Sequence, residues 1–314
     1  MPQNPSRRHF LRTTTLATAA TIIAPRFLQS QIPDRVLQAR EAAQKTPIKT
    51  TKLYDNVFLL QGAGGNIALQ TGPEGHLLID SSFATAVPAI LSAAKAAGPG
   101  APKTLINTHW HYDHTDGNEN LHSAGYTITA HTKTRERLST PQHIRAFNLN
   151  FPPNPAGAIP TITFDATKSI SQNGDTLELV HFDPAHTDTD IYIHFQKANV
   201  LHCGDTFFNG FYPFIDDSSG GSIGGMIRAN EKALALANAD TKIIPGHGTL
   251  GTKADLQAVH DMLSGVREKV ASLKSSGLTE QEVIAKKPTA QWDAKWANGM
   301  LNGDAITGLA YRTL

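Results

Sequence analysis

Cysteine is nearly missing from this 314-residue chain, because Cys203 is the only one. A single cysteine can form neither a disulfide framework nor a cysteine-rich zinc site, so a bound metal would need histidine and carboxylate ligands. Cys203 itself lies in an apolar stretch, and we expect it to be a core residue. The net charge is also small: the chain has 28 Lys and Arg residues and 27 Asp and Glu residues, with no long run of either sign. This balance argues against a nucleic-acid partner and favours a small-molecule substrate.

The first 31 residues differ in composition from the rest, with a basic start, a Thr- and Ala-rich middle and a small-residue region before Pro25. This layout is typical of a signal peptide. Its start, "SRRHFL" at 6–11, resembles the twin-arginine export signal. We therefore predict that residues 1–31 are an export signal peptide, that the twin-arginine export machinery is a partner, and that the protein is periplasmic or otherwise exported. A disordered basic tail is the alternative. The apolar part is too short and too polar for a stable membrane span.

The rest of the chain is predicted to be one α/β catalytic domain at 45–314 that ends in helices. After a polar connector, helical or loose, its first half is expected to hold strands at 57–60, 66–70, 76–79, 104–107 and "YTITAH", and helices at 84–97, 117–123 and 133–138. Its second half is expected to hold strands of a second sheet at 168–172, 176–182, 189–195 and 200–203, then a helix at 222–238, a strand at "TKIIP", and helices at 252–276, 279–286 and 290–312. Between the halves, residues 139–163 carry five prolines and little periodicity, which predicts a long surface segment that acts as a wall or lid.

One short stretch, "HWHYDH", concentrates metal-binding side chains directly after an apolar strand: His109, His111, Asp113 and His114. The first two lie two positions apart in an extended loop and can point the same way, whereas Asp113 and His114 begin the next turn and can face a neighbouring point. Imidazole and carboxylate ligands suit zinc, and also iron or manganese. One ion cannot easily use all four, so we predict two ions and further ligands elsewhere. A solvated polar loop with incidental histidines is the alternative.

Three later side chains lie where such ligands are needed. His186 is in a loop between two strands, Asp205 follows an apolar strand and a glycine, and His247 follows an apolar strand and a Pro-Gly turn. Taken alone, His186 could be a hydrogen-bonded loop residue and Asp205 a helix or turn cap. Their recurrence at successive strand ends favours a role as ligands.

Together these motifs resemble the metallo-β-lactamase superfamily, whose hallmark His-x-His-x-Asp-His loop is "HWHYDH" here. The resemblance covers about residues 50 to 250 and includes "LLIDSS", "PAHT", "GD" and "PGHG". It implies an α/β fold, the αββα four-layer sandwich, in which two mixed β-sheets are flanked by helices and two metal ions lie at one edge. It assigns His109, His111 and His186 to one zinc, and Asp113, His114 and His247 to the other, with Asp205 bridging. It further implies that Asp80 hydrogen-bonds toward the site from outside the ligand set.

By the same resemblance we expect a dinuclear zinc hydrolase in which a metal-bridging hydroxide attacks a carbonyl group and Asp113 orients or transfers a proton. Asp205 resembles the lactonase, thioesterase and phosphodiesterase pattern more than that of true β-lactamases. The predicted substrate is an ester, a lactone or a β-lactam-like cyclic amide. The alternatives are an iron-dependent oxidoreductase similar to the sulfur dioxygenases and a glyoxalase II-like thioesterase.

An aromatic run, "FFNGFYPFID", follows Asp205. Its Phe and Tyr side chains are expected either to form an apolar wall for the substrate or to pack beneath the site. Tyr212 is a candidate catalytic residue, because its hydroxyl could donate a hydrogen bond to a carbonyl oxygen. Few cationic residues lie near the motifs, which argues against a phosphodiester substrate.

Overall fold

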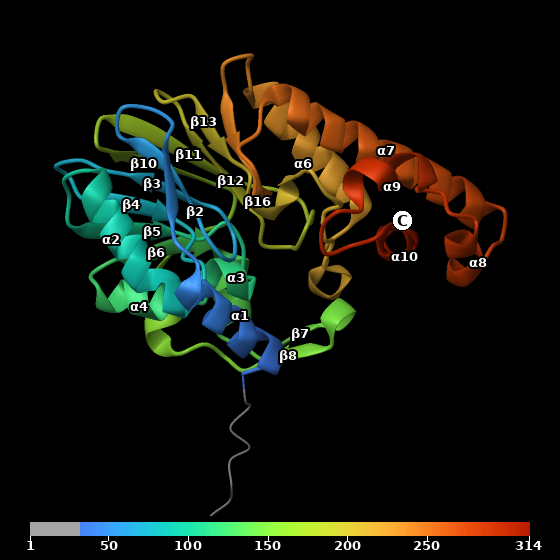
Figure 1. The fold of residues 1–314 in the computed structure, drawn as a ribbon, viewed down its shortest axis with the longest axis horizontal. Coiled ribbons are helices and arrows are strands. Elements are labelled where there is room, and N and C mark those ends of the chain that lie inside the picture. Colours follow the sequence, from blue (N-terminus) through green and yellow to red (C-terminus); the bar gives the residue numbers. More distant parts are fainter. Residues whose placement is uncertain (1–31) are drawn as a thin grey trace, which may run out of the picture. The chain divides into compact units, whose positions relative to one another are not determined.

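The computed structural model describes residues 32–314, and the expected export signal at 1–31 lies outside the described part of the chain. Residues Gln31–Leu314 form one compact unit. Two β-sheets lie face to face within it, and helices cover their outer faces (Figure 1). This arrangement confirms the predicted αββα sandwich.

The first sheet has seven strands in the order β1-β2-β3-β4-β5-β6-β9. Its first four strands form an antiparallel meander, and β4, β5, β6 and β9 run parallel. The strands are β1 (Lys49–Lys52), β2 (Val57–Gln61), β3 (Ile67–Gln70), β4 (His76–Ile79), β5 (Pro102–Ile106), β6 (Thr127–His131) and β9 (Ile162–Phe164). The helices of this half are α1 (Asp34–Lys45), η1 (Ala84–Ala86), α2 (Val87–Ala97), α3 (Tyr112–Thr115), α4 (Asn118–Ser123) and α5 (Thr132–Leu138).

The second sheet has five strands in the order β10-β11-β12-β13-β15, antiparallel except for the last pair. They are β10 (Thr167–Gln172), β11 (Asp175–His181), β12 (Ile191–Phe195), β13 (Val200–His202) and β15 (Lys242–Ile244). Two small ribbons pair β7 (Gln142–Ile144) with β8 (Leu149–Phe151), and β14 (Phe208–Asn209) with β16 (His247–Gly248). The remaining helices are η2 (Arg145–Phe147), η3 (Ala156–Ala158), η4 (Gly204–Thr206), η5 (Asp217–Ser219), α6 (Ile223–Leu236), α7 (Lys253–Ser275), α8 (Glu280–Ala285), α9 (Ala290–Trp296) and α10 (Gly303–Arg312).

Period-two alternation along the strands builds three apolar layers. On β2, Val57 and Leu59 belong to the core between the two sheets, whereas Phe58 and Leu60 pack in the core that contains Ile90 of α2. A third core joins the outer face of the second sheet to α6 and α7. Since a fully buried aliphatic or aromatic side chain contributes about 1.5–3 kcal/mol, these layers fix the register of both sheets and the place of the loops at their ends.

Helix α1 lies in the segment that was predicted to be a polar connector, helical or loose. Arg40 on this helix donates to Asp116 at 2.8 Å, and the same carboxylate accepts a hydrogen bond from the backbone N–H of Ala84. The helix is therefore tied to the loop that carries the histidine cluster. None of the helices within 32–314 is both long enough and apolar enough to cross a membrane.

One prediction about secondary structure was incomplete, and one was wrong. Residues 139–163 are more ordered than a bare surface segment, because they contain β7, β8 and the start of β9, and because Ile144 and Leu149 are buried. The helix predicted at 290–312 is interrupted at 297–302: Asn302 caps α10 by accepting from the Ala305 N–H, and a side chain at Gly299 would meet the Phe211 ring at 2.7 Å.

Candidate metal centre

The polar side chains of the cluster come from strand ends at one edge of the two sheets. Asp80 follows β4, and His109, His111, Asp113 and His114 follow β5 and enter α3. His186 lies in the loop between β11 and β12, Asp205 lies in η4 after β13, and His247 begins β16 after β15. The carboxyl ends of neighbouring parallel strands meet at a common edge, so residues far apart in sequence converge there.

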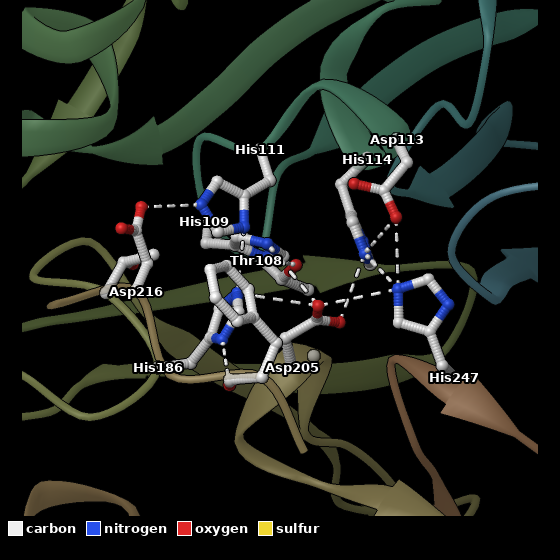
Figure 2. Close-up of polar contacts among 12 residues, drawn as sticks. Thr108, His109, His111, Asp113, His114, His186, Asp205, Asp216 and His247 are labelled. Carbon is white, nitrogen blue, oxygen red and sulfur yellow. Dashed lines mark hydrogen bonds and ion pairs between the residues drawn. The ribbon is translucent and has the colours of Figure 1, made fainter. Parts of the chain in front are cut away.

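The seven predicted ligands form two groups, in each of which the ligand atoms lie within 4.8 Å of one another. One group contains His109, His111, His186 and Asp205, all buried; the other contains Asp113, His114 and His247. Figure 2 shows the two groups on either side of the Asp205 carboxylate. The division is the one that the sequence resemblance implied.

Asp205 lies between the groups and reaches both. Its Oδ2 atom is 3.5 Å from His186 Nε2 and 3.8 Å from His109 Nε2. On the other side, Oδ1 is 3.1 Å from His114 Nε2, and Oδ2 is 3.4 Å from His247 Nε2. The position suits a carboxylate shared between two ions.

Hydrogen bonds fix which nitrogen of His111 and of His186 carries a proton. His111 donates from Nε2 to the Asp216 carboxylate at 3.0 Å, and His186 donates from Nδ1 to the carbonyl oxygen of Phe214 at 2.8 Å. In the neutral form of each ring, the other nitrogen is a bare lone pair. These two nitrogens, His111 Nδ1 and His186 Nε2, face each other at 2.8 Å. At that distance the two nitrogens need either a proton between them or a bound cation beside them.

Asp80 orients the other two histidines in the same way. The Thr108 hydroxyl and the His114 Nδ1–H both donate to Asp80 Oδ2, at 2.7 Å each. Because the Thr108 hydroxyl hydrogen is used, its oxygen accepts from His109 Nδ1 at 3.0 Å. The Nε2 atoms of His109 and His114 therefore lie on the inner side of the centre, where His114 Nε2 is 3.1 Å from Asp205 Oδ1. Within 32–314 the buried His109 Nε2 has no hydrogen-bond partner.

The carboxylates of the centre stay ionised. Burial alone would raise the pKa of Asp113, but the neighbouring His114 and His247 outweigh it and lower the value to about 2. Burial opposes ionisation of Asp205 too, yet His247 and His114 hold its pKa well below the usual range. Burial lowers the pKa of His109, which keeps this ring neutral. Burial opposes a positive charge on His114 and His247, but Asp205 and Asp113 outweigh it and raise both pKa values, that of His247 to about 9. Carboxylates that attract positive charge in this way form a site for cations, and five nitrogen and two oxygen donors suit zinc, iron or manganese.

Asp216 and Thr108 are the site residues that the sequence did not single out. Asp216 is fully buried, lies 105 residues from His111 in sequence, and ends the aromatic run as the last letter of "FFNGFYPFID". An acidic residue at the end of an apolar run was the feature of the sequence that could have identified Asp216 as a site residue. Asp80, which the resemblance implied, has a left-handed backbone with φ of 68°, unusual for a residue other than glycine.

A pocket of about 290 Å³ opens onto the centre and is lined by His111, Asp113, Asp205 and His247. Most of its other walls are apolar: Ile144, Phe147, Phe208, Phe211, Phe214 and Met300 are among them. The aromatic run therefore has both of the expected roles: several of its rings line the pocket, whereas Phe207 is fully buried and packs in the core. The segment 139–163 contributes to the pocket wall through Ile144 and Phe147. Cys203 is 1% exposed and packs in the core, as predicted.

Tyr212 lines the pocket, but its hydroxyl is engaged elsewhere. The hydroxyl donates to Asp293 of α9 at 2.9 Å, and the carbonyl oxygen of Thr289 lies 3.5 Å away. Burial and Asp293 raise the pKa of Tyr212. These contacts favour a role in attaching α9 over the predicted role as a donor to substrate.

A serine nucleophile has no support in the fold, although residues 220–224 read Gly-Gly-Ser-Ile-Gly and fit the Gly-x-Ser-x-Gly pattern. Ser222 is the N-cap of α6: its side chain accepts from the Gly225 N–H at 3.0 Å and its hydroxyl lies 3.5 Å from the carbonyl oxygen of Pro184. The serine therefore caps a helix.

Comparison with curated proteins finds partial matches to two enzymes named hydroxyacylglutathione hydrolase. The one from Gloeobacter violaceus is 31% identical over 112 residues, which are 34% of this chain and 35% of that enzyme. The one from Rhodospirillum rubrum is 30% identical over 171 residues, 54% of this chain and 56% of that enzyme. The chain thus matches at most about half the length of either relative.

Solved structures match in fold at low sequence identity. A metallo-beta-lactamase from Pontibacter korlensis superposes with a TM-score of 0.56 at 17% identity, over 69% of this chain and 99% of its own. A stereoselective inverting sec-alkylsulfatase from a Pseudomonas species superposes with a TM-score of 0.63 at 16% identity, over 91% of this chain and 53% of its own. The sequence model of the Metallo-beta-lactamase superfamily matches residues 60–247, a range that includes every predicted ligand. These findings support the prediction of a metal-dependent hydrolase, and the chain belongs to the metallo-beta-lactamase superfamily.

Proposed function

We propose that this protein is a dinuclear zinc hydrolase that cleaves an ester, a lactone or a β-lactam-like cyclic amide. The observation that carries the proposal is the orientation of the histidines. The outer nitrogens of four rings are fixed by Thr108, Asp80, Asp216 and the Phe214 carbonyl, so that their inner lone pairs converge on the Asp205 carboxylate. Bound cations would balance such an arrangement.

In this proposal His109, His111 and His186 hold one ion, Asp113, His114 and His247 hold the other, and Asp205 is shared. Zinc bound there supplies Lewis acidity and a hydroxide nucleophile at neutral pH. Asp113 lines the pocket and lies 3.0 Å from His247, and its low pKa keeps it ionised. It is therefore the described carboxylate best placed to accept a hydrogen bond from a nucleophile and so to orient it.

The pocket walls support an apolar substrate. No Lys or Arg is among the described residues that line the pocket, and aromatic rings form much of its surface. A phosphodiester or a multiply charged substrate would find no cationic partner on these walls. A neutral acyl group gains from burial against the rings.

A glyoxalase II-like thioesterase is the second candidate, and the two hydroxyacylglutathione hydrolases favour it. The same chemistry at the carbonyl would serve a thioester. The apolar walls argue for a less polar thiol than glutathione. An iron-dependent oxidoreductase remains the alternative with a different metal, since imidazole and carboxylate ligands also suit iron.

The test is metal analysis of protein purified without added metal, followed by turnover assays with nitrocefin, a homoserine lactone, an aryl ester, S-lactoylglutathione and a bis-phenyl phosphodiester. We expect two zinc ions per chain and hydrolysis of the ester or the lactone. Hydrolysis of the thioester alone would select the second candidate. Iron with oxygen consumption, or no hydrolysis by the two-zinc protein, would contradict the proposal.

We also propose that the protein is exported through the twin-arginine route, on the strength of "SRRHFL". Replacement of Arg7 and Arg8 by Lys should retain the protein in the cytoplasm, as measured by cell fractionation and immunoblotting. A matched replacement of Arg12 by Lys should leave export intact. An unchanged distribution of the double variant would contradict the proposal.

A further inference from the structure

We propose that Phe147 limits the length of the apolar acyl chain that the pocket accepts. This inference rests on the proposed hydrolase function. Its basis is that Phe147 lines two hollows: the pocket of about 290 Å³ at the metal centre, and a groove of about 460 Å³ beside it. Among the described residues, Phe147 is the one that the two linings share, and we infer that its ring is a partition that separates them.

Phe147 belongs to a short helix that lies outside both large sheets. Phe147 ends η2, which connects the two strands of the β7–β8 ribbon (Figure 1). Its ring centroid lies 4.8 Å from that of Phe214, a wall of the pocket. The guanidinium of Arg35 on α1 lies 4.5 Å from the centroid of the Phe147 ring. Phe147 is half-buried and packs at the margin of the core that contains α6 and α7, outside the strands of both sheets, so its replacement removes the partition and leaves the sheets in place.

The groove behind the partition offers apolar surface. Ile284, Leu301 and Leu309 from the C-terminal region line it. Its charged residues are already paired: Arg312 bonds Asp217 at 2.9 Å and also pairs with Glu280. A groove of this kind has little to offer a charged ligand, but an alkyl chain that reached it would gain from burial.

The position of Phe147 makes a quantitative expectation possible. Each methylene group that is buried improves kcat/KM about fourfold, provided that the pocket has room for it. In the wild-type protein this gain should stop when the chain meets Phe147. In Phe147→Ala the chain should continue into the groove, so that an ester two methylenes longer than the wild-type optimum has a kcat/KM about 16-fold above that of the ester at that optimum.

The experiment measures kcat/KM of the zinc-loaded full chain on p-nitrophenyl esters from acetate to dodecanoate. Phe147→Ala should move the optimum to longer chains, and Phe147→Trp should move it to shorter ones. Phe211→Ala is the matched control, because Phe211 lines the pocket but not the groove. It should lower activity on all esters without moving the optimum. Adding Ala305→Trp, which fills the groove, to Phe147→Ala should reverse the shift.

The outcomes separate the two claims. If the wild-type protein hydrolyses esters and Phe147→Ala leaves the chain-length optimum in place, the inference is wrong while the hydrolase function stands. If no ester is hydrolysed, the ester-hydrolase proposal fails. Calorimetric titration with octanoate and dodecanoate then decides the inference, which requires that Phe147→Ala tighten dodecanoate binding more than octanoate binding. Circular dichroism and the Phe147→Leu variant check that a shift does not come from misfolding.

Discussion

Replacement of Asp216 by Asn should weaken the binding of one of the two metal ions and leave the binding of the other unchanged. Asp216 is fully buried and accepts the Nε2–H of His111 at 3.0 Å, while the same carboxylate accepts the backbone N–H of Ser218 at 3.0 Å. An Asn amide has one acceptor oxygen, so either His111 or the serine turn loses its partner. A freed His111 ring can take the other tautomer, which puts its proton on Nδ1 and removes the lone pair that faces His186.

The size of the effect follows from the role of such partners. Loss of a hydrogen bond that orients a metal-bound histidine lowers metal affinity about 10- to 100-fold, which corresponds to about 1.4 to 2.8 kcal/mol. The site held by Asp113, His114 and His247 makes no hydrogen bond to Asp216 among the described residues and should keep its affinity. Competition with a chromophoric chelator resolves the two zinc dissociation constants.

Asp217→Asn is the matched control for this measurement. Asp217 is the next residue, and its carboxylate pairs with Arg312 and Arg145 without touching a histidine of the centre. Its replacement should change both zinc dissociation constants by less than about threefold, since it leaves the ligand tautomers alone. If Asp216→Asn bound both ions as tightly as the wild-type protein, the argument from the hydrogen-bonded tautomers would be refuted.

Three further predictions concern the centre and its surroundings. In Gly246→Ala, the added Cβ would lie 1.8 Å from Asp205 Oδ1, so the carboxylate must move; zinc content by elemental mass spectrometry should fall below two, and a full complement would contradict the bridging role. Removal of zinc with a chelator should lower the unfolding midpoint, because zinc at 100 times its dissociation constant stabilises the folded state by about 2.7 kcal/mol; an unchanged midpoint would argue against binding. Burial is the main cause that lowers the pKa of His181 to about 4, and the stacked ring of His131 is the second cause. In the unfolded chain His181 takes up a proton below about pH 6.5, whereas in the folded protein it does so only below about pH 4. The contribution of neutral His181 to the free energy of unfolding is therefore fully present above about pH 6.5 and is lost as the pH falls toward about 4. His181→Gln, compared with wild type as metal-free protein, should lose less stability between pH 6.5 and 4.5 in thermal unfolding, and an equal loss would contradict the assignment.

The fold and the ligand set could be predicted because both depend on local patterns. Strands β5, β13 and β15 end at Ile106, His202 and Ile244, and His109, Asp205 and His247 each come three residues after one of these ends. Parallel pairing of β4 with β5 and of β13 with β15 then brings the ends to one edge. The packing of "HWHYDH" into six positions limited the choices further.

The remaining features depend on contacts between distant segments, which the local pattern does not contain. Asp216 supports His111 only because the loop before α6 folds back over the centre. The hydroxyl of Tyr212 points to a partner 81 residues away on α9, so its position in the aromatic run gave no sign of its engagement. Phe147 gains its place between the pocket and the groove from the C-terminal helices, whose interruption at 297–302 was also missed.

The most direct test of the central claim is anomalous diffraction at the zinc absorption edge, from crystals of protein purified without added metal. The account predicts two peaks, one beside His109, His111 and His186, and one beside Asp113, His114 and His247, with Asp205 within coordination distance of both. A single peak, or two peaks of which only one contacts Asp205, would contradict the shared-carboxylate arrangement on which the proposed chemistry depends.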